Sequence, residues 1–159
     1  MSDLGSFKGL APIAFESVSA VTATPSVQLG TRRTHQGEDY VYFYNSTGSN
    51  VTQGAAMTIS ALSGYSLTRS TTAGADIAIC FVKHADVAAG SYAWGLVRGL
   101  VNPLAVSAIS AGQLLRLGAD GIVATYATVT SWDFGPVGKM VGSSTSSTAD
   151  GVAYVKCFG

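Results

Sequence analysis

Hydrophobic and polar positions alternate along much of this chain, which is the pattern of β-strands and not of amphipathic helices. In residues 39–44, three tyrosines alternate with Val41 and Phe43. Residues 77–82 are all apolar, with large side chains at every second position of the first five. We therefore predict a strand in each segment, the second of them buried on both faces.

Turn sequences between the apolar runs predict hairpins. Residues 45–50 are polar and precede a run at 56–60, so the strands at 39–44 and 56–60 are predicted to pair. The dipeptide Asp120-Gly121 favours a tight turn, which predicts a second hairpin. The remaining predicted strands cover residues 91–101, 109–117, 122–125, 132–141 and 151–158.

The strand predicted at residues 91–101 contains two glycines, Gly95 and Gly99, on the same face. Glycine within a strand marks a bend, a bulge or the close approach of another backbone. Short strands separated by glycine-containing turns are typical of sandwiches and barrels. We predict an all-β fold for residues 37–159, a compact sandwich or barrel of short antiparallel strands that forms one domain.

The first part of the chain, residues 1–36, shows no strand or helix period. Its large apolar residues, such as Phe7, Leu10 and Phe15, are separated by prolines, glycines and polar residues. Proline restricts itself and the preceding residue to extended conformations. We therefore predict an extended N-terminal arm that lies on a partner through Phe7, Leu10 and Phe15. A frayed terminus is the alternative, although such tails seldom carry repeated large apolar residues.

Composition indicates assembly rather than catalysis. Only 11% of the residues are charged, 47% are hydrophobic and the formal net charge is zero, whereas about a quarter of an ordinary domain is charged. A chain without net charge does not attract a nucleic-acid backbone or an anionic membrane. No window reaches the length of a membrane span, and Pro12 and Glu16 interrupt the apolar stretch that an export signal needs. We predict neither nucleic acid nor membrane as a partner.

Residues that carry out catalysis or bind metal do not cluster in the sequence. His35 and His84 are the only histidines, and neither stands in a metal-ligand spacing. There is no G-x-S-x-G motif and no pair of carboxylates placed to face each other across a cleft. Cys80 and Cys157 lie in apolar runs and are predicted to be buried thiols, with a disulfide left open. We predict no enzymatic activity, no metal site and no cofactor.

Two groups of residues leave alternatives open. Arg32 and Arg33, at the end of the predicted arm, either pair with carboxylates of a partner, which the planar guanidinium suits, or are solvated. Tyr40, Tyr42 and Tyr44 share one face of a predicted strand. They form either a core layer, which is favoured, or an exposed stripe for sugar binding or subunit packing.

Three segments resemble the small capsid decoration proteins, also called cement proteins, of tailed bacteriophages. They are residues 86–125, with their strand and turn glycines, and the closing segments 137–142 and 151–155. The resemblance implies a compact β domain, commonly trimeric, that sits outside a phage head and braces subunits of the major capsid protein. The family supplies no catalytic residue. The long arm before Gln36 departs from the short members of the family.

We therefore predict a structural virion protein, a capsid decoration protein that forms a homo-oligomer, with a trimer favoured. Its expected place is the outer surface of the capsid, after assembly in the host cytoplasm. One alternative is a carbohydrate-binding or host-attachment module of a phage tail fibre, which would use the tyrosines and Trp132. Another is a tail-tube protein, which open-ended polymerisation would distinguish from a closed oligomer.

Overall fold

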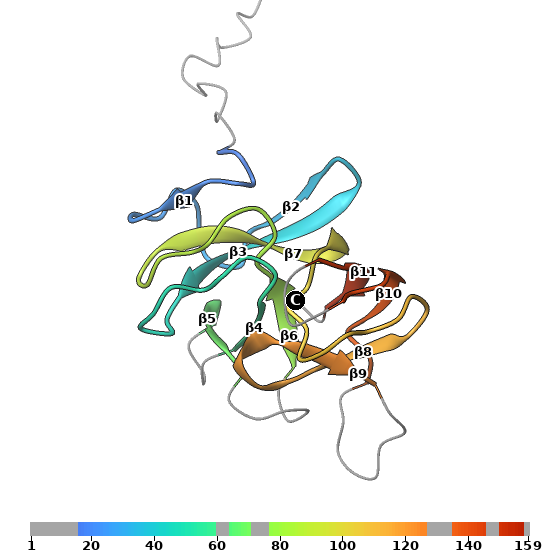
Figure 1. The fold of residues 1–159 in the computed structure, drawn as a ribbon. Helices are drawn as coiled ribbons and strands as arrows, with labels where there is room; N and C mark the ends of the chain where they lie inside the picture. Colours follow the sequence, from blue (N-terminus) through green and yellow to red (C-terminus); the bar gives the residue numbers. More distant parts are fainter. Residues whose placement is uncertain (1–15, 60–63, 71–76, 127–134, 146–149, 158–159) are drawn as a thin grey trace, which may run out of the picture.

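The computed structural model describes residues 16–59, 64–70, 77–126, 135–145 and 150–157, which are built from β-strands (Figure 1). These residues contain no α-helix, and one 3₁₀ turn, η1, spans Ala119–Gly121. The all-β prediction is confirmed. The strands are β1 (Val21–Thr22), β2 (Arg32–His35), β3 (Glu38–Asn45), β4 (Ala56–Ile59), β5 (Ser66–Arg69), β6 (Ala78–Phe81), β7 (Tyr92–Val101), β8 (Leu114–Leu117), β9 (Val123–Thr125), β10 (Gly138–Gly142) and β11 (Val152–Lys156).

Five strands close into a barrel. β3 pairs with β5, β5 with β4, β4 with β6, and β6 with β7, which returns to β3. The β3–β5 pair is parallel and the other four pairs are antiparallel. Closure leaves none of the unpaired edges that an open sheet of these strands would expose. The prediction of a compact sandwich or barrel is confirmed.

Strand β7 is shared by the barrel and by a second group of strands. Its first part pairs with β3, while residues 98–101 pair with β11. Beyond β11 the sheet continues through β10, β8 and β9, and these strands lie together beside the barrel (Figure 1). β8 and β9 form the hairpin predicted at Asp120, whose φ of 56° lies in the left-handed region.

The middle of β3 and all of β6 are buried on both faces. The four residues of β3 from Tyr40 to Phe43 are at most 1% exposed, and all four residues of β6 are buried. Tyr44 is half-buried. Tyr40 and Tyr42 therefore belong to the core and not to an exposed stripe, and the predicted burial of β6 on both faces is confirmed.

The hairpin predicted between residues 39–44 and 56–60 is wrong. β3 has β5 as its parallel neighbour, and β4 lies between β5 and β6. The polar segment after β3 is anchored on the loop before β7, because Val51 forms a β-bridge with Val87. A segment held there cannot also form the tight turn that would fold β4 back onto β3.

The boundary predicted after Gln36, between arm and body, falls inside a hairpin. Gln36 and Gly37 both have positive φ, 51° and 81°, and they join β2 to β3, as is typical of a type I′ turn. β1 pairs with β7, so residues 16–36 lie on the barrel. The sequence pattern missed β2 because all of its residues are polar or charged. Residues 1–15 lie outside the described part of the chain.

Candidate functional site

The structure describes two of the five residues predicted to contact a partner. Arg32 is exposed on β2, while Arg33 is half-buried. Arg33 Nη1 donates a hydrogen bond to the backbone carbonyl of Glu16, and its guanidinium carbon lies 5.8 Å from the ring centroid of Trp94. Arg33 thus holds the start of the described chain against the barrel. The other three, Phe7, Leu10 and Phe15, lie outside the described residues.

A cavity of about 240 Å³ lies beside Arg32 and is also lined by Thr34 and Asp39. The Asp39 carboxylate accepts a hydrogen bond from Thr34 Oγ1 at 2.9 Å and forms an ion pair with Arg98 Nε at 2.9 Å. Arg32, in contrast, makes no ion pair with a residue that the structure describes. Its guanidinium is therefore available to a carboxylate of a partner.

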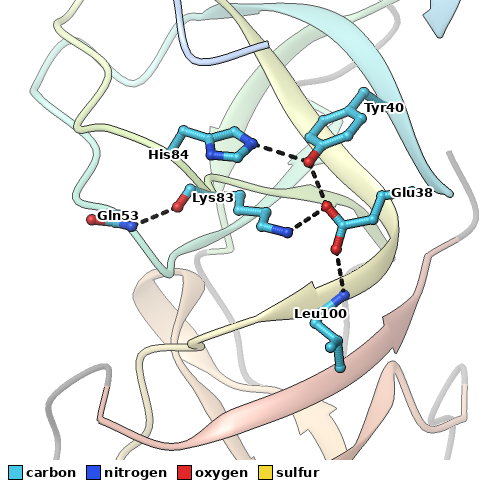
Figure 2. A network of polar contacts seen from close by, with 6 residues as sticks. All are labelled: Glu38, Tyr40, Gln53, Lys83, His84 and Leu100. Carbon is cyan, nitrogen blue, oxygen red and sulfur yellow. Dashed lines mark hydrogen bonds and ion pairs between the residues drawn. The ribbon is translucent and has the colours of Figure 1, made fainter. Parts of the chain in front are cut away.

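A polar cluster centres on Glu38, the first residue of β3 (Figure 2). Glu38 Oε2 accepts a hydrogen bond from the Tyr40 hydroxyl at 2.6 Å and pairs with Lys83 Nζ. Glu38 Oε1 accepts the backbone N–H of Leu100 at 3.0 Å. The Tyr40 oxygen also lies 3.0 Å from His84 Nε2, and the two rings are stacked. The cluster therefore connects β3, β7 and the segment that follows β6.

The hydrogen bonds of the cluster fix its protons. Tyr40 donates its single proton to Glu38, so its oxygen accepts from His84, which places the imidazole proton on Nε2. Partial burial and the charge of Lys83 lower the pKa of His84. Burial raises the pKa of Glu38, but its three hydrogen-bond donors outweigh burial and lower that pKa overall. Burial and the neighbouring carboxylate raise the pKa of Tyr40.

This arrangement is that of a structural brace. Both Glu38 oxygens are occupied by donors from the chain itself. The cavity that reaches His84 measures about 10 Å³, close to the least that holds one water. Gly99 has φ 145°, and a Cβ there would lie 2.8 Å from Glu38 Cγ. Gly99, where the sequence predicts a bend, a bulge or the close approach of another backbone, is the sequence signal for this cluster, and the group that lies against it is the Glu38 side chain.

The other candidate residues do not form a reactive site. In the described parts of the chain, no group of three or more His, Cys, Asp or Glu side chains could hold a metal ion. Asp86 accepts the backbone N–H of Gln53 at 2.8 Å. Cys80 and Cys157 are buried and free, which confirms the prediction of core thiols. No helix of the described residues is long and apolar enough to span a membrane.

Comparison with known proteins gives a fold but no family. No protein-family model and no curated protein matches the sequence. Among solved structures, the head fiber gp8.5 N base of bacteriophage phi29 is similar, with a TM-score of 0.50 and 21% sequence identity. The match covers 74% of this chain and 93% of that chain. At this identity the similarity shows a shared fold, so the β architecture described above also occurs in the base of a phage head fiber.

Proposed function

We propose that this chain is a structural protein of a tailed-phage virion, attached to the outside of the head. The observation that carries the proposal is the fold, which matches 93% of the phi29 head fiber base. Because one fold can host many functions, composition matters as well. Only 11% of the residues are charged, which suits a surface that packs against neighbouring subunits.

Within this role, we propose capsid decoration: the chain binds the major capsid protein and stabilises contacts between capsid subunits. The resemblance to cement proteins supports this and extends over β7 to β11. A protein that binds the assembled shell, and not separate subunits, adds its free energy of association to the stability of the shell. The proposed role is non-enzymatic, in keeping with a Glu38 cluster whose groups are occupied by one another.

The proposed capsid contacts are the arm residues Phe7, Leu10 and Phe15, together with Arg32. Glu16 is held beside β2 by Arg33, so the described chain starts next to the strand on which Arg32 is exposed. Large apolar residues, together with an arginine that makes no ion pair with a described residue, suit an interface, where aromatic residues and arginine contribute most of the binding energy. A homotrimer is the proposed oligomer, as the family resemblance implies.

Co-sedimentation of the full chain with phage heads assembled without it tests the proposal. The parent protein should saturate a fixed number of sites per head. The combined Phe7→Ser and Leu10→Ser variant, and separately Arg32→Glu, should lower occupancy. Ile59→Ser, at a side chain 51% exposed on β4, is the matched control and should bind as the parent does. Failure of the parent to sediment with heads would overturn the proposal.

The two alternative functions, a carbohydrate-binding or host-attachment module and a tail-tube protein, are tested separately. A glycan-binding module would use the tyrosines and Trp132; Tyr40 and Tyr42 are at most 1% exposed, and Trp132 lies outside the described residues. Glycan binding by the purified protein would nevertheless favour it. A tail-tube protein would polymerise without limit, whereas a decoration protein gives a closed oligomer of one size in analytical ultracentrifugation.

A further inference from the structure

Four outward side chains form a line across strands β7, β11, β10 and β8. Tyr154 on β11 lies opposite Leu100 and, on its other side, opposite Lys139, which in turn lies opposite Leu114. Neighbours along the strand, such as Ala153, are buried, so this line lies on the outer face of the sheet. At the usual spacing between strands the line is about 14 Å long.

This line is strongly apolar for an exposed surface. Leu100, Tyr154 and Leu114 are 47%, 46% and 43% exposed. Next to it lies a groove of about 430 Å³, lined by Leu114, Tyr154, the exposed Pro136 and the buried Cys157. A cavity of this volume is in the range that binds small ligands or a few large side chains.

Among the described residues, the charge around the groove is positive. Lys139 and Lys156 line it and are exposed. The ion pairs found among the described residues join Lys83 to Glu38 and Arg98 to Asp39, so neither groove lysine has a carboxylate partner there. Two unpaired ammonium groups beside an apolar wall match a ligand that carries both an apolar group and carboxylates.

We propose that this groove docks a segment of a partner protein that packs a large apolar side chain against the groove walls at Leu114 and Tyr154 and places carboxylates against Lys139 and Lys156. A second copy pairing through the same face is disfavoured, because two-fold symmetry would place lysines against lysines. The groove lies on β8, β10 and β11, whereas the proposed capsid contacts begin beside β2. The proposal therefore does not depend on where the chain sits in a virion.

A peptide titration of the isotope-labelled full chain, followed by NMR, tests this directly. The probe is a short peptide with a central phenylalanine flanked by glutamates, and the matched peptide has lysines in place of the glutamates. The acidic peptide should shift the amide resonances of Lys139, Tyr154 and Lys156 in a saturable way, and the basic peptide should not. The double variant Lys139→Glu and Lys156→Glu should bind the acidic peptide at least tenfold more weakly than the parent does, and should bind the basic peptide instead.

Controls separate the groove from the rest of the surface. Arg32→Glu and Ile59→Ser change exposed residues on β2 and β4 and should leave the titration unchanged, and thermal unfolding should show that every variant is folded. Equal shifts with both peptides, or none, would overturn the proposal. The proposal would also be overturned if the parent formed oligomers that dissociate in a Tyr154→Lys variant, because a second copy of the chain would then occupy the groove. If Phe7→Ser shifted the amide resonance of Tyr154 in the absence of peptide, the arm would be the occupant of the groove, and the proposal would again be overturned.

Discussion

Gly95 on β7 lies directly against Cys80 on β6. A Cβ added at Gly95 would fall 2.2 Å from Cys80 Sγ and 2.8 Å from Cys80 Cβ, with Phe43 Cε1 at 3.2 Å. Cys80 and Phe43 are both fully buried, so neither can move into solvent to make room. The glycine in β7 is therefore required by the packing of the barrel core.

Gly95→Ala should destabilise the protein by about 1–3 kcal/mol, because overpacking a filled core displaces side chains and backbone. Urea unfolding at equilibrium measures the change. Gly142→Ala is the matched control, since a Cβ there would lie 3.7 Å from its nearest neighbour, and it should change stability by less than about 0.5 kcal/mol. Equal midpoints for Gly95→Ala and the parent would contradict the packing argument.

Asn45 is the polar anchor of the loop that follows β3. It is fully buried, its Nδ2 lies 2.9 Å from the Val87 carbonyl and 3.1 Å from that of Ala88, and its Oδ1 accepts the Thr47 N–H at 3.0 Å. Asn45→Ala should cost about 2–3 kcal/mol, because it leaves these buried groups without partners. Thermal unfolding measures the loss.

The control for this prediction is Asn50→Ala. Asn50 accepts one exposed hydrogen bond, from the Ala89 N–H at 3.2 Å, so its loss should cost less than about 1 kcal/mol. If Asn45→Ala and Asn50→Ala were equally stable, burial would not distinguish the two amides. Asn45 would then not be the anchor of this loop.

Strands β3 and β6 were predictable because the signal for each depends on its own residues. The alternation in β3 and the apolar run of β6 required no knowledge of a partner. Which strands pair depends on contacts between distant residues, and the parallel β3–β5 pair, with Tyr44 opposite Ser66, left no local signal. The wrong hairpin comes from this limit, whereas β2 was missed because its residues are all polar or charged.

The polar cluster shows the same limit at the level of side chains. Glu38 and Lys83 are far apart in the sequence, and closure of the barrel brings them together. Gly99 was predicted to mark a bend, a bulge or the close approach of another backbone, but the sequence could not identify the Glu38 side chain as the group that lies against it. The line of exposed side chains on the outer sheet face was also missed, because Lys139 and Tyr154 become neighbours only through strand register.

Acid should destabilise the protein through His84 and Glu38. Both have a pKa in the folded protein below their ordinary values of 6.5 and 4.5, so the unfolded chain binds more protons as the pH falls. Their contribution to stability is complete above pH 6.5 for His84 and above pH 4.5 for Glu38, and is lost as the pH falls through the lowered values. The free energy of unfolding, measured from pH 8 to 4, should therefore decrease.

Substitutions of His84 and Glu38 test which of the two residues causes the loss of stability in each pH range. His84→Gln should flatten the curve near pH 6, and Glu38→Gln should flatten it below pH 4.5 while lowering stability at neutral pH, since Lys83 loses its carboxylate. An NMR titration should give a pKa for His84 below 6.5. An increase in the free energy of unfolding between pH 7 and 5 would contradict the stabilising role of the Glu38 cluster.

Tyr40→Phe should destabilise the protein by about 1–2 kcal/mol, because it removes one donor from Glu38 and the acceptor of His84. Chemical denaturation measures the effect. Tyr154→Phe, at an exposed residue, is the matched control and should be neutral within about 0.5 kcal/mol. If both tyrosine variants were equally stable, the Tyr40 hydroxyl would contribute nothing to the fold.

The two cysteines should resist alkylation as long as the protein is folded. Burial raises the pKa of Cys157 to about 12, and burial together with the nearby Cys157 raises the pKa of Cys80. At pH 8 only about one Cys157 thiol in ten thousand is then ionised, and the thiolate is the reactive form. Iodoacetamide should therefore modify neither residue in the native protein and both in denaturant, as mass spectrometry would show. Rapid modification of the native protein, or a mass lower by two hydrogens that indicates a disulfide, would contradict the free, buried thiols seen in the core.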